Sequence, residues 1–238
     1  ENKTARFQYL FRRLVRAVEQ ILDNVIEELR VSDFAPIDYE LDFSRSGDLP
    51  PVQCEDGDVS VSLSGKVDRV DGYIKNGRLY LRVMDYKSGK KSFSLSDIWY
   101  GLNMQLIIYL YALQQEGLGR YRARLTAELN EIVPAGVLYV PVRDELPDAA
   151  RDTDEEGLRI LRDKALRRSG LLSDDMSLLE AMEHGLEGDG RFIPVSIKTG
   201  KGEEEPTLAA KSAVADLAKF GRLARYTQKK LLEMGQAL

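Results

Sequence analysis

Two aspartates and a lysine form the part of the sequence that is best suited to chemistry. Asp68 and Asp85 lie in two runs of alternating apolar and polar residues that flank Asn76-Gly77, and Lys87 follows Asp85 by two positions. Asn-Gly between such runs predicts a hairpin with a two-residue turn, which would place Asp68 opposite Asp85. Lys87 would share the face of Asp85, because side chains two apart in a strand point the same way.

Facing carboxylates require compensation, because opposed residues of an antiparallel pair have Cβ atoms ~5 Å apart and like charges there are destabilising. Mg²⁺ provides it, since it takes oxygen ligands at ~2.1 Å and binds through one or two carboxylates plus waters and phosphate oxygens. A metal here would activate a water, and Lys87 could orient that water or stabilise developing negative charge. The pattern predicts metal-dependent phosphodiester hydrolysis. The alternative is an ordinary solvated strand face.

Other polar residues near these three allow two interpretations. Gln105 and Tyr109 stand four apart on one face of an otherwise apolar helical segment, where they could orient a phosphate or the lysine. They could equally be a buried Gln and Tyr whose polar atoms are satisfied by the backbone. Asp71 should face Arg82 on the opposite side of the sheet, where a cross-strand ion pair explains it.

The elements expected around these residues mix helices with strands. Residues 143–190 are charged and irregular, and we expect them to be an insertion within a single domain that covers 1–238. The order predicts an α/β fold, with a small mixed sheet flanked by helices. The expected elements are a helix over 7–29, a strand over 37–43, a loop over 44–58, strands over 59–74 and 79–84, helices over 98–115 and 119–131, a strand over 136–142, a strand over 192–197 and a helix over 208–234.

Composition excludes several classes of protein. The 238 residues are 43% hydrophobic, enough for one sizeable core, and the net charge of -5 means that any DNA contact must be local. A single cysteine, Cys54, cannot form an internal disulfide, a zinc cage or an iron-sulfur site, and it fits a reducing cytoplasmic setting. No apolar run approaches the ~18 residues of a membrane span, so no membrane association is expected.

Three motifs in this order closely resemble those of RecB-like PD-(D/E)XK nucleases, namely G-x-x-D-R-x-D, D-Y-K-[ST]-G and Q-x-x-x-Y. The tyrosine and glycine before the third motif look most like the nuclease domain of the AddB subunit of bacterial helicase-nucleases. The resemblance is strong over residues 37–116. Residues 134–142 and 192–238 resemble the family only in their general pattern. The matching segments are Gly65-Lys66-Val67-Asp68-Arg69-Val70-Asp71, then Met84-Asp85-Tyr86-Lys87-Ser88-Gly89, then Tyr100-Gly101-Leu102-Asn103-Met104-Gln105-Leu106 with Tyr109.

The resemblance implies a restriction-endonuclease-like core and a site that acts on DNA with Mg²⁺, for which Mn²⁺ can substitute. Asp68, Asp85 and the backbone carbonyl of Tyr86 would bind the metal, and Lys87 would be the catalytic lysine. It further implies an exonuclease-type domain of a helicase-nuclease, working with a partner subunit in DNA double-strand break repair and recombination.

The resemblance also implies that Gln105 and Tyr109 are an accessory pair. Glu40 lies on a strand where related nucleases sometimes carry an acid. Asp38 and Asp42 share its expected face, however, and solvation explains all three equally well. Glu40 therefore stays outside the predicted catalytic set.

Two features of the family are absent from the sequence. RecB-like members usually carry a histidine metal ligand upstream of the first strand, and AddB-type members carry four cysteines of an iron-sulfur cluster. The single histidine, His184, has no matching position, and Cys54 cannot hold a cluster. Because the chain opens at Glu1 and ends at Leu238, we expect a fragment of a longer protein.

Contacts to DNA are expected at two places. Residues 208–234 hold six lysines and arginines against two acids, which could touch phosphates or form a solvated helix face. Trp99 and Tyr100 could stack on unpaired bases, although we expect at least one of them to pack in the core. The competing functions are a catalytically silent scaffold that binds DNA or a helicase, and a hydrolase of small phosphorylated substrates, which no Gly-rich phosphate loop supports.

Overall fold

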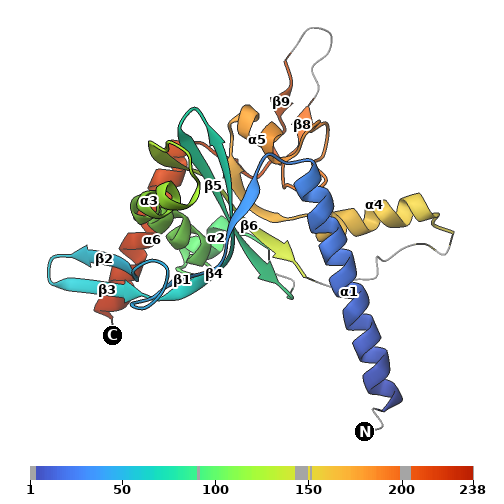
Figure 1. Ribbon diagram of the computed structural model, residues 1–238, viewed down its shortest axis with the longest axis horizontal. Coiled ribbons are helices and arrows are strands. Elements are labelled where there is room, and N and C mark those ends of the chain that lie inside the picture. Colours follow the sequence, from blue (N-terminus) through green and yellow to red (C-terminus); the bar gives the residue numbers. More distant parts are fainter. Residues whose placement is uncertain (1–3, 90–91, 143–149, 151, 199–204, 238) are drawn as a thin grey trace.

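A six-stranded mixed sheet forms the centre of the molecule (Figure 1), in the order β1-β4-β5-β6-β7-β10. The computed structural model describes residues 4–89, 92–142, 150, 152–198 and 205–237. Two further pairs of strands, β2-β3 and β8-β9, stand outside this sheet. The elements are α1 (Ala5–Arg30), β1 (Ala35–Phe43), β2 (Val52–Asp56), β3 (Val59–Leu63), β4 (Gly65–Lys75), β5 (Arg78–Lys87), α2 (Leu95–Trp99), α3 (Gln105–Arg124), β6 (Glu131–Pro141), α4 (Glu155–Leu166), β7 (Ser169–Ser173), α5 (Met176–Met182), β8 (Ile197–Lys198), β9 (Thr207–Leu208), β10 (Val214–Ala215) and α6 (Leu217–Gln236).

The β4–β5 hairpin has the predicted register. Its two strands are antiparallel, with pairs from Lys75 and Arg78 at the turn to Arg69 and Met84 at the other end. Both residues of the Asn76-Gly77 turn have positive φ, 53° and 74°, as a type I′ turn requires. The turn therefore fixes which residues face each other along the whole hairpin.

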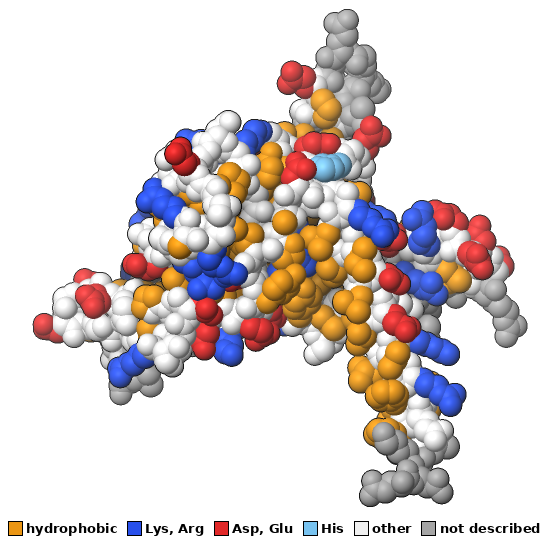
Figure 2. Space-filling model, in the orientation of Figure 1, with side chains coloured by type: hydrophobic (Ala, Val, Ile, Leu, Met, Phe, Trp, Pro, Cys, Tyr) orange, Lys and Arg blue, Asp and Glu red, His pale blue; other side chains and the backbone are white. Residues whose placement is uncertain are grey.

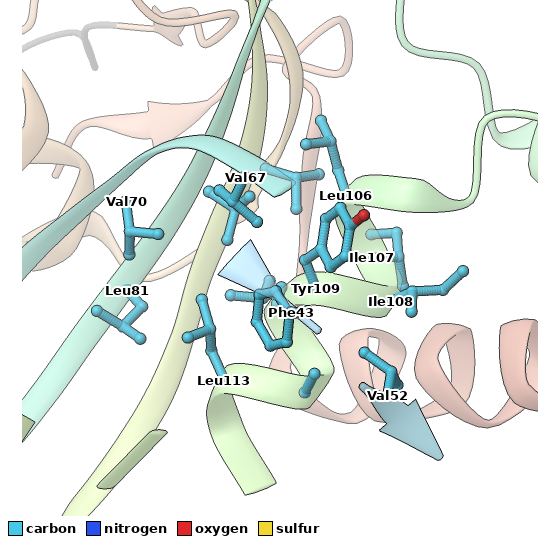
Figure 3. Close-up of a cluster of buried hydrophobic side chains, with 14 of the residues drawn as sticks. Phe43, Val52, Val67, Val70, Leu81, Leu106, Ile107, Ile108, Tyr109 and Leu113 are labelled. Atoms are coloured by element: carbon cyan, nitrogen blue, oxygen red, sulfur yellow. The ribbon is translucent and has the colours of Figure 1, made fainter. Parts of the chain in front are cut away.

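Two apolar clusters pack on the two faces of the sheet. The larger cluster joins α2, α3 and α6 to the sheet, and Figure 3 shows part of it, with Phe43 and Tyr109 side by side. The smaller cluster packs α5 and the buried segment 192–197 against the other face, around Met84 and Leu138. The observed mixed sheet flanked by helices confirms the predicted fold class.

Buried charges link α1 to the face opposite α3. Arg82 donates to Asp71 at 2.9 Å, which confirms the predicted cross-strand pair, and Arg69 joins the same carboxylate with two hydrogen bonds of 2.6 and 2.7 Å. Glu28 of α1 lies 3.2 Å from Arg82 and accepts a 2.7 Å hydrogen bond from Arg168. These five side chains are at most 1% exposed, so charge pairing rather than water stabilises them.

The first helix, α1, is amphipathic as predicted, but much of its apolar side is exposed. Figure 2 shows a line of hydrophobic side chains along this helix as it extends from the body of the molecule. None of the helices in the described ranges is apolar over enough length to cross a bilayer. The exposed apolar residues of α1 are Phe7, Tyr9, Leu10, Phe11, Leu14, Val15, Val18, Leu22 and Ile26.

The helix expected over 98–115 is instead two helices, α2 and α3, separated by a break. Gly101 and Asn103 have positive φ of 77° and 55°, a conformation that ends a helix. The predicted end at residue 115 is also wrong, because α3 continues to Arg124. Gly117 is buried in the helix against β6, where a Cβ would lie 3.2 Å from a methyl of Ile132.

Several other boundaries differ from the prediction. The expected loop 44–58 contains β2, which pairs with β3. Within the expected strand 192–197 only Ile197 belongs to a regular strand, and the closing helix begins at Leu217 after β9 and β10. Part of 143–190 lies outside the described residues, and the rest includes β7, a strand of the main sheet. That 143–190 is an insertion remains a prediction.

Candidate functional site

The two aspartates lie where the β4–β5 hairpin opens, beyond the last backbone pair of Arg69 with Met84. Asp68 follows in the register as the residue opposite Asp85. Here the hydrogen bond comes from a side chain and not from the backbone, because Asp68 Oδ2 accepts the backbone N–H of Tyr86 at 2.7 Å. This hydrogen bond holds the carboxylate of Asp68 beside the backbone that carries Asp85.

Lys87 and Asp85 form an ion pair on the side of the sheet that faces α3. The side chains of Lys87 and Asp85 are 28% and 11% exposed, so the pair is largely shielded but open to solvent at the lysine. The ammonium of Lys87 lies 5.7 Å from the centre of the Tyr139 ring, and Tyr139 is the parallel neighbour of Asp85 on β6. Burial, followed by the charges of Asp85 and Asp97, raises the pKa of Tyr139 to about 12.

Helix α3 contributes Tyr109, which is buried against the start of β4. Its ring stacks on Phe43 with centroids 5.1 Å apart, and its hydroxyl approaches Gly65 so closely that a Cβ there would lie 1.9 Å from it. Burial raises the pKa of Tyr109, the charges of Asp85 and Asp42 add to this, and a hydrogen bond with Gln105 opposes it. Tyr109 thus lies within the electrostatic reach of Asp85.

Gln105 is the first residue of α3 and its side chain is exposed, so the alternative of a buried, backbone-satisfied glutamine is wrong for this residue. It stands one helical turn before Tyr109, and both side chains line one small pocket. The structure therefore brings Gln105 and Tyr109 together, and it sets Tyr109 on the face of the sheet that carries Asp68 and Asp85.

The three acids of β1 do not behave alike, contrary to the expectation of one solvated face. Asp38 is buried and pairs with Arg120 and Arg124 of α3, whereas Asp42 is half-buried. A bulge near the start of β1 shifts the register of its pairing with β4, and with it the alternation of side chains between the two faces of the sheet. Glu40 is exposed, has a positive φ of 48°, and falls in the register between the pairs that flank Asp68, so it lies across from that residue.

A family match decides what this arrangement belongs to. Residues 1–233 match the family model described as the PD-(D/E)XK nuclease superfamily. The chain belongs to the PD-(D/E)XK nuclease superfamily.

Similar proteins are named as subunits of an ATP-dependent helicase/deoxyribonuclease. This PD-(D/E)XK chain is 35% identical over 230 residues to that of Ruminiclostridium cellulolyticum, covering 96% of the chain and 19% of the relative. It is 35% identical over 227 residues to the protein of Acetivibrio thermocellus, covering 95% of the chain and 19% of that relative. It is 34% identical over 214 residues to the protein of Clostridium acetobutylicum, covering 89% of the chain and 17% of that relative. The chain therefore spans less than a fifth of the length of these relatives.

The oxygen donors at the open end of the hairpin fit a hard divalent cation, as this superfamily generally uses. Asp68 and Asp85 offer carboxylates, and carboxylates, carbonyls and water are the ligands that Mg²⁺ and Mn²⁺ take. Within the described ranges no group of three or more His, Cys, Asp or Glu side chains is arranged around a possible metal position. Two protein carboxylates and further oxygen ligands are the usual complement for Mg²⁺.

Two residues next to the acids were missing from the sequence-based site. Tyr139 belongs to an apolar run that is typical of any buried strand, and only the parallel pairing of β5 with β6 reveals that it is the neighbour of Asp85. Gly65 had a local signal, as the glycine of the first motif, but its contact with Tyr109 depends on packing. His184 lies 3.0 Å from Asp33, and Cys54 is buried in the larger apolar cluster.

Proposed function

We propose that this chain is the nuclease domain of a helicase-nuclease and hydrolyses DNA phosphodiester bonds with Mg²⁺. The observation that carries the proposal is the placement of Asp68 and Asp85 at facing positions of one hairpin, with Lys87 paired to Asp85. A scaffold gains nothing from two opposed acids, because they destabilise a sheet unless a cation compensates. Membership of a nuclease superfamily supports the same conclusion.

Each site residue has a proposed task. Asp68, Asp85 and the backbone carbonyl of Tyr86 would hold the cation. When bound, the cation polarises the scissile phosphate and lowers the pKa of a water. Lys87 is positioned by Asp85 to orient the attacking water or to stabilise charge on the phosphate.

Gln105 and Tyr109 would position the phosphate beside Lys87. Gln105 is exposed and carries an amide that can donate to a phosphate oxygen, while Tyr109 is held between Phe43 and Gly65. The two side chains line the same small pocket, so the amide stands beside the phenol. They are proposed as accessory residues of the reaction.

The names of the relatives extend the proposal beyond this domain. We propose that the whole protein acts with a partner subunit and a helicase activity on DNA ends, in the cytoplasm, in double-strand break repair and recombination. Exonuclease-type cleavage suits such a role, because a helicase delivers a strand from its end.

The proposal is tested by incubating the purified chain with end-labelled single-stranded DNA and Mg²⁺ or Mn²⁺. We expect cleavage that EDTA abolishes, and a loss of at least about a hundredfold in rate for Lys87→Ala, as for removal of one group that stabilises transition-state charge. Lys75→Ala is the matched control, because Lys75 is an exposed lysine at the opposite end of the same hairpin. It should leave the rate unchanged.

Two outcomes would contradict the proposal. Cleavage that survives Lys87→Ala would show that the reaction occurs elsewhere. A folded chain that binds the DNA but does not cleave it with either metal would favour a scaffold that binds DNA or a helicase.

A further inference from the structure

An apolar groove lies between α2, α6 and the β7–β10 side of the sheet, on the same face as Asp85. It has a volume of about 410 Å³, within the ~300–1,000 Å³ of small-molecule sites. Its apolar walls include Leu171 and Ala215, and Lys219 and Arg222 of α6 line it as well. Both basic side chains are exposed, so the groove combines an apolar wall with positive charge at its rim.

Trp99 at the end of α2 forms one wall of this groove and is open to solvent. One face of its indole stacks on Tyr226 of α6, with centroids 5.2 Å apart and ring planes 7° apart. The Tyr226 hydroxyl donates to the Trp99 carbonyl at 2.6 Å, and the ammonium of Lys230 lies 5.8 Å from the Tyr226 ring. Trp99 is nevertheless 64% exposed and Tyr100 78% exposed, so the expectation that one of them packs in the core is wrong.

Tyr226 therefore supports one face of the Trp99 ring, while much of the ring stays exposed to solvent. The stacking contact orients the indole, and the hydrogen bond from Tyr226 to the Trp99 carbonyl ties the end of α2 to α6. An indole stacked on one face and widely exposed can accept a further flat ring on the other. Apolar cores rarely leave such a ring exposed, because burying it would remove a large apolar area from water.

The groove lies on the same face of the sheet as the proposed catalytic residues. Leu171 on β7 pairs with Val137 on β6, two residues before Tyr139, which in turn neighbours Asp85 on β5. Two strand spacings of ~4.8 Å separate β7 from β5, or about 10 Å across the sheet. The charge of Asp97 on α2 contributes to the raised pKa of Tyr139, so α2 lies within electrostatic reach of that residue.

We propose that Trp99 is a base-stacking subsite for single-stranded DNA, with Lys219 and Arg222 contacting the phosphates on either side of the stacked base. The inference rests on the proposed nuclease function, which makes a nucleic-acid strand the ligand of this face. A stacked aromatic beside basic side chains is the usual way to hold an unpaired strand without reading its sequence. A base pair in the interior of a duplex cannot use the site, because both its faces are already stacked on neighbouring pairs.

The sequence offers a direct probe, because Trp99 is the single tryptophan of the chain. The titration uses an oligothymidylate in EDTA, so that cleavage cannot occur, with binding followed by anisotropy of a labelled strand. We expect tryptophan fluorescence to be quenched in parallel with the anisotropy change. A duplex of the same length should produce much less quenching at equal occupancy.

Variants separate stacking from charge. Trp99→Ala should weaken oligothymidylate binding by about fivefold to a hundredfold, the range for one stacked base, and Trp99→Tyr should recover part of the loss. Arg222→Ala should leave stacking in place but reduce the slope of log affinity against log salt by roughly 0.7, the value for one phosphate contact on a single strand. Tyr39→Ala, an equally exposed aromatic on β1, is the control and should not change binding.

The inference is overturned if the strand binds without quenching, if Trp99→Ala binds as tightly as the unmodified chain while its circular dichroism is unchanged, or if no strand binds at all. Failure of the proposed function is a different result. Quenching with no metal-dependent cleavage would leave the stacking subsite standing and remove the nuclease, whereas cleavage without quenching would do the reverse.

Discussion

At the scale of single residues, Tyr109 of the Q-x-x-x-Y motif packs directly against Gly65 of the G-x-x-D-R-x-D motif. The phenol of Tyr109 occupies the space that a side chain at position 65 would need, since a Cβ there would lie 1.9 Å from the hydroxyl oxygen and 3.1 Å from Cζ. Gly65 begins β4, and Asp68 follows three residues later. The close approach therefore fixes α3 against the strand that carries the first acid.

This contact predicts a specific pattern in a double-mutant cycle. Gly65→Ala should lower the free energy of unfolding by about 1–3 kcal/mol, as for overpacking in a core, because the added methyl overlaps the Tyr109 hydroxyl. Tyr109→Phe removes that oxygen and should recover part of the loss when the two changes are combined. Urea denaturation measures all four proteins. Equal losses from Gly65→Ala with and without the hydroxyl would show that the contact is not the cause.

At the same scale, the sequence predicted the facing of Asp68 and Asp85 because a two-residue turn sets a register by counting alone. It could not predict that Asp68 accepts the N–H of Tyr86, since the same sequence is compatible with backbone pairing that continues to these residues. Nor could it identify Tyr139, whose neighbour Asp85 belongs to a strand more than 50 residues earlier in the chain. A local sequence pattern predicts the pairing of strands that are joined by a short turn. The parallel pairing of distant strands depends on how the whole sheet is assembled.

Among the elements, α1 is tied to the sheet through a buried carboxylate, Glu28, that contacts Arg82 and Arg168. Burial of Glu28 raises its pKa, but Arg168, Arg82 and Arg69 outweigh this effect, so the pKa lies below the ordinary 4.5. Because the folded pKa is lowered, the stabilisation is fully present above the unfolded pKa and is lost as the pH falls through the folded value. The loss therefore begins below about pH 4.5.

Glu28→Gln should destabilise the chain by about 3–5 kcal/mol at neutral pH, because it leaves buried arginines without a compensating charge. It should also flatten the dependence of the melting temperature on pH below about 4.5. Glu156→Gln is the control, since that residue pairs with Arg159 on the exposed side of α4 and should melt like the unmodified chain. A melting curve for Glu28→Gln that matches the control would refute the proposed anchoring.

The accuracy of the predicted elements follows from how each is determined. The α1 helix and the β4–β5 hairpin have strong periodicity and a diagnostic turn, and both form as expected. The break between α2 and α3 was missed because Gly101 and Asn103 interrupt an apolar spacing that is still typical of a helix. The burial of Asp38 was missed because its partners, Arg120 and Arg124 of α3, lie 82 and 86 residues away in the chain.

On the scale of the whole molecule, the chain matches 19% of the length of the first relatives and its described residues form a six-stranded mixed sheet. Its composition predicted one domain in which any DNA contact is local, and both remain predictions. Lys219 and Arg222 line a groove on the face of the sheet that carries the acids. The exposed apolar side of α1 was not predicted, because periodicity shows that a helix has an apolar face but not what covers it.

Every proposed step of the reaction depends on a divalent cation at the open end of the β4–β5 hairpin. Anomalous diffraction from crystals of the chain soaked in Mn²⁺ would locate such a cation. We predict a manganese peak within about 2.5 Å of carboxylate oxygens of both Asp68 and Asp85, which is lost in Asp85→Asn. Well-ordered acids with no peak between them, or a peak that persists unchanged in Asp85→Asn, would show that these residues are not the metal site.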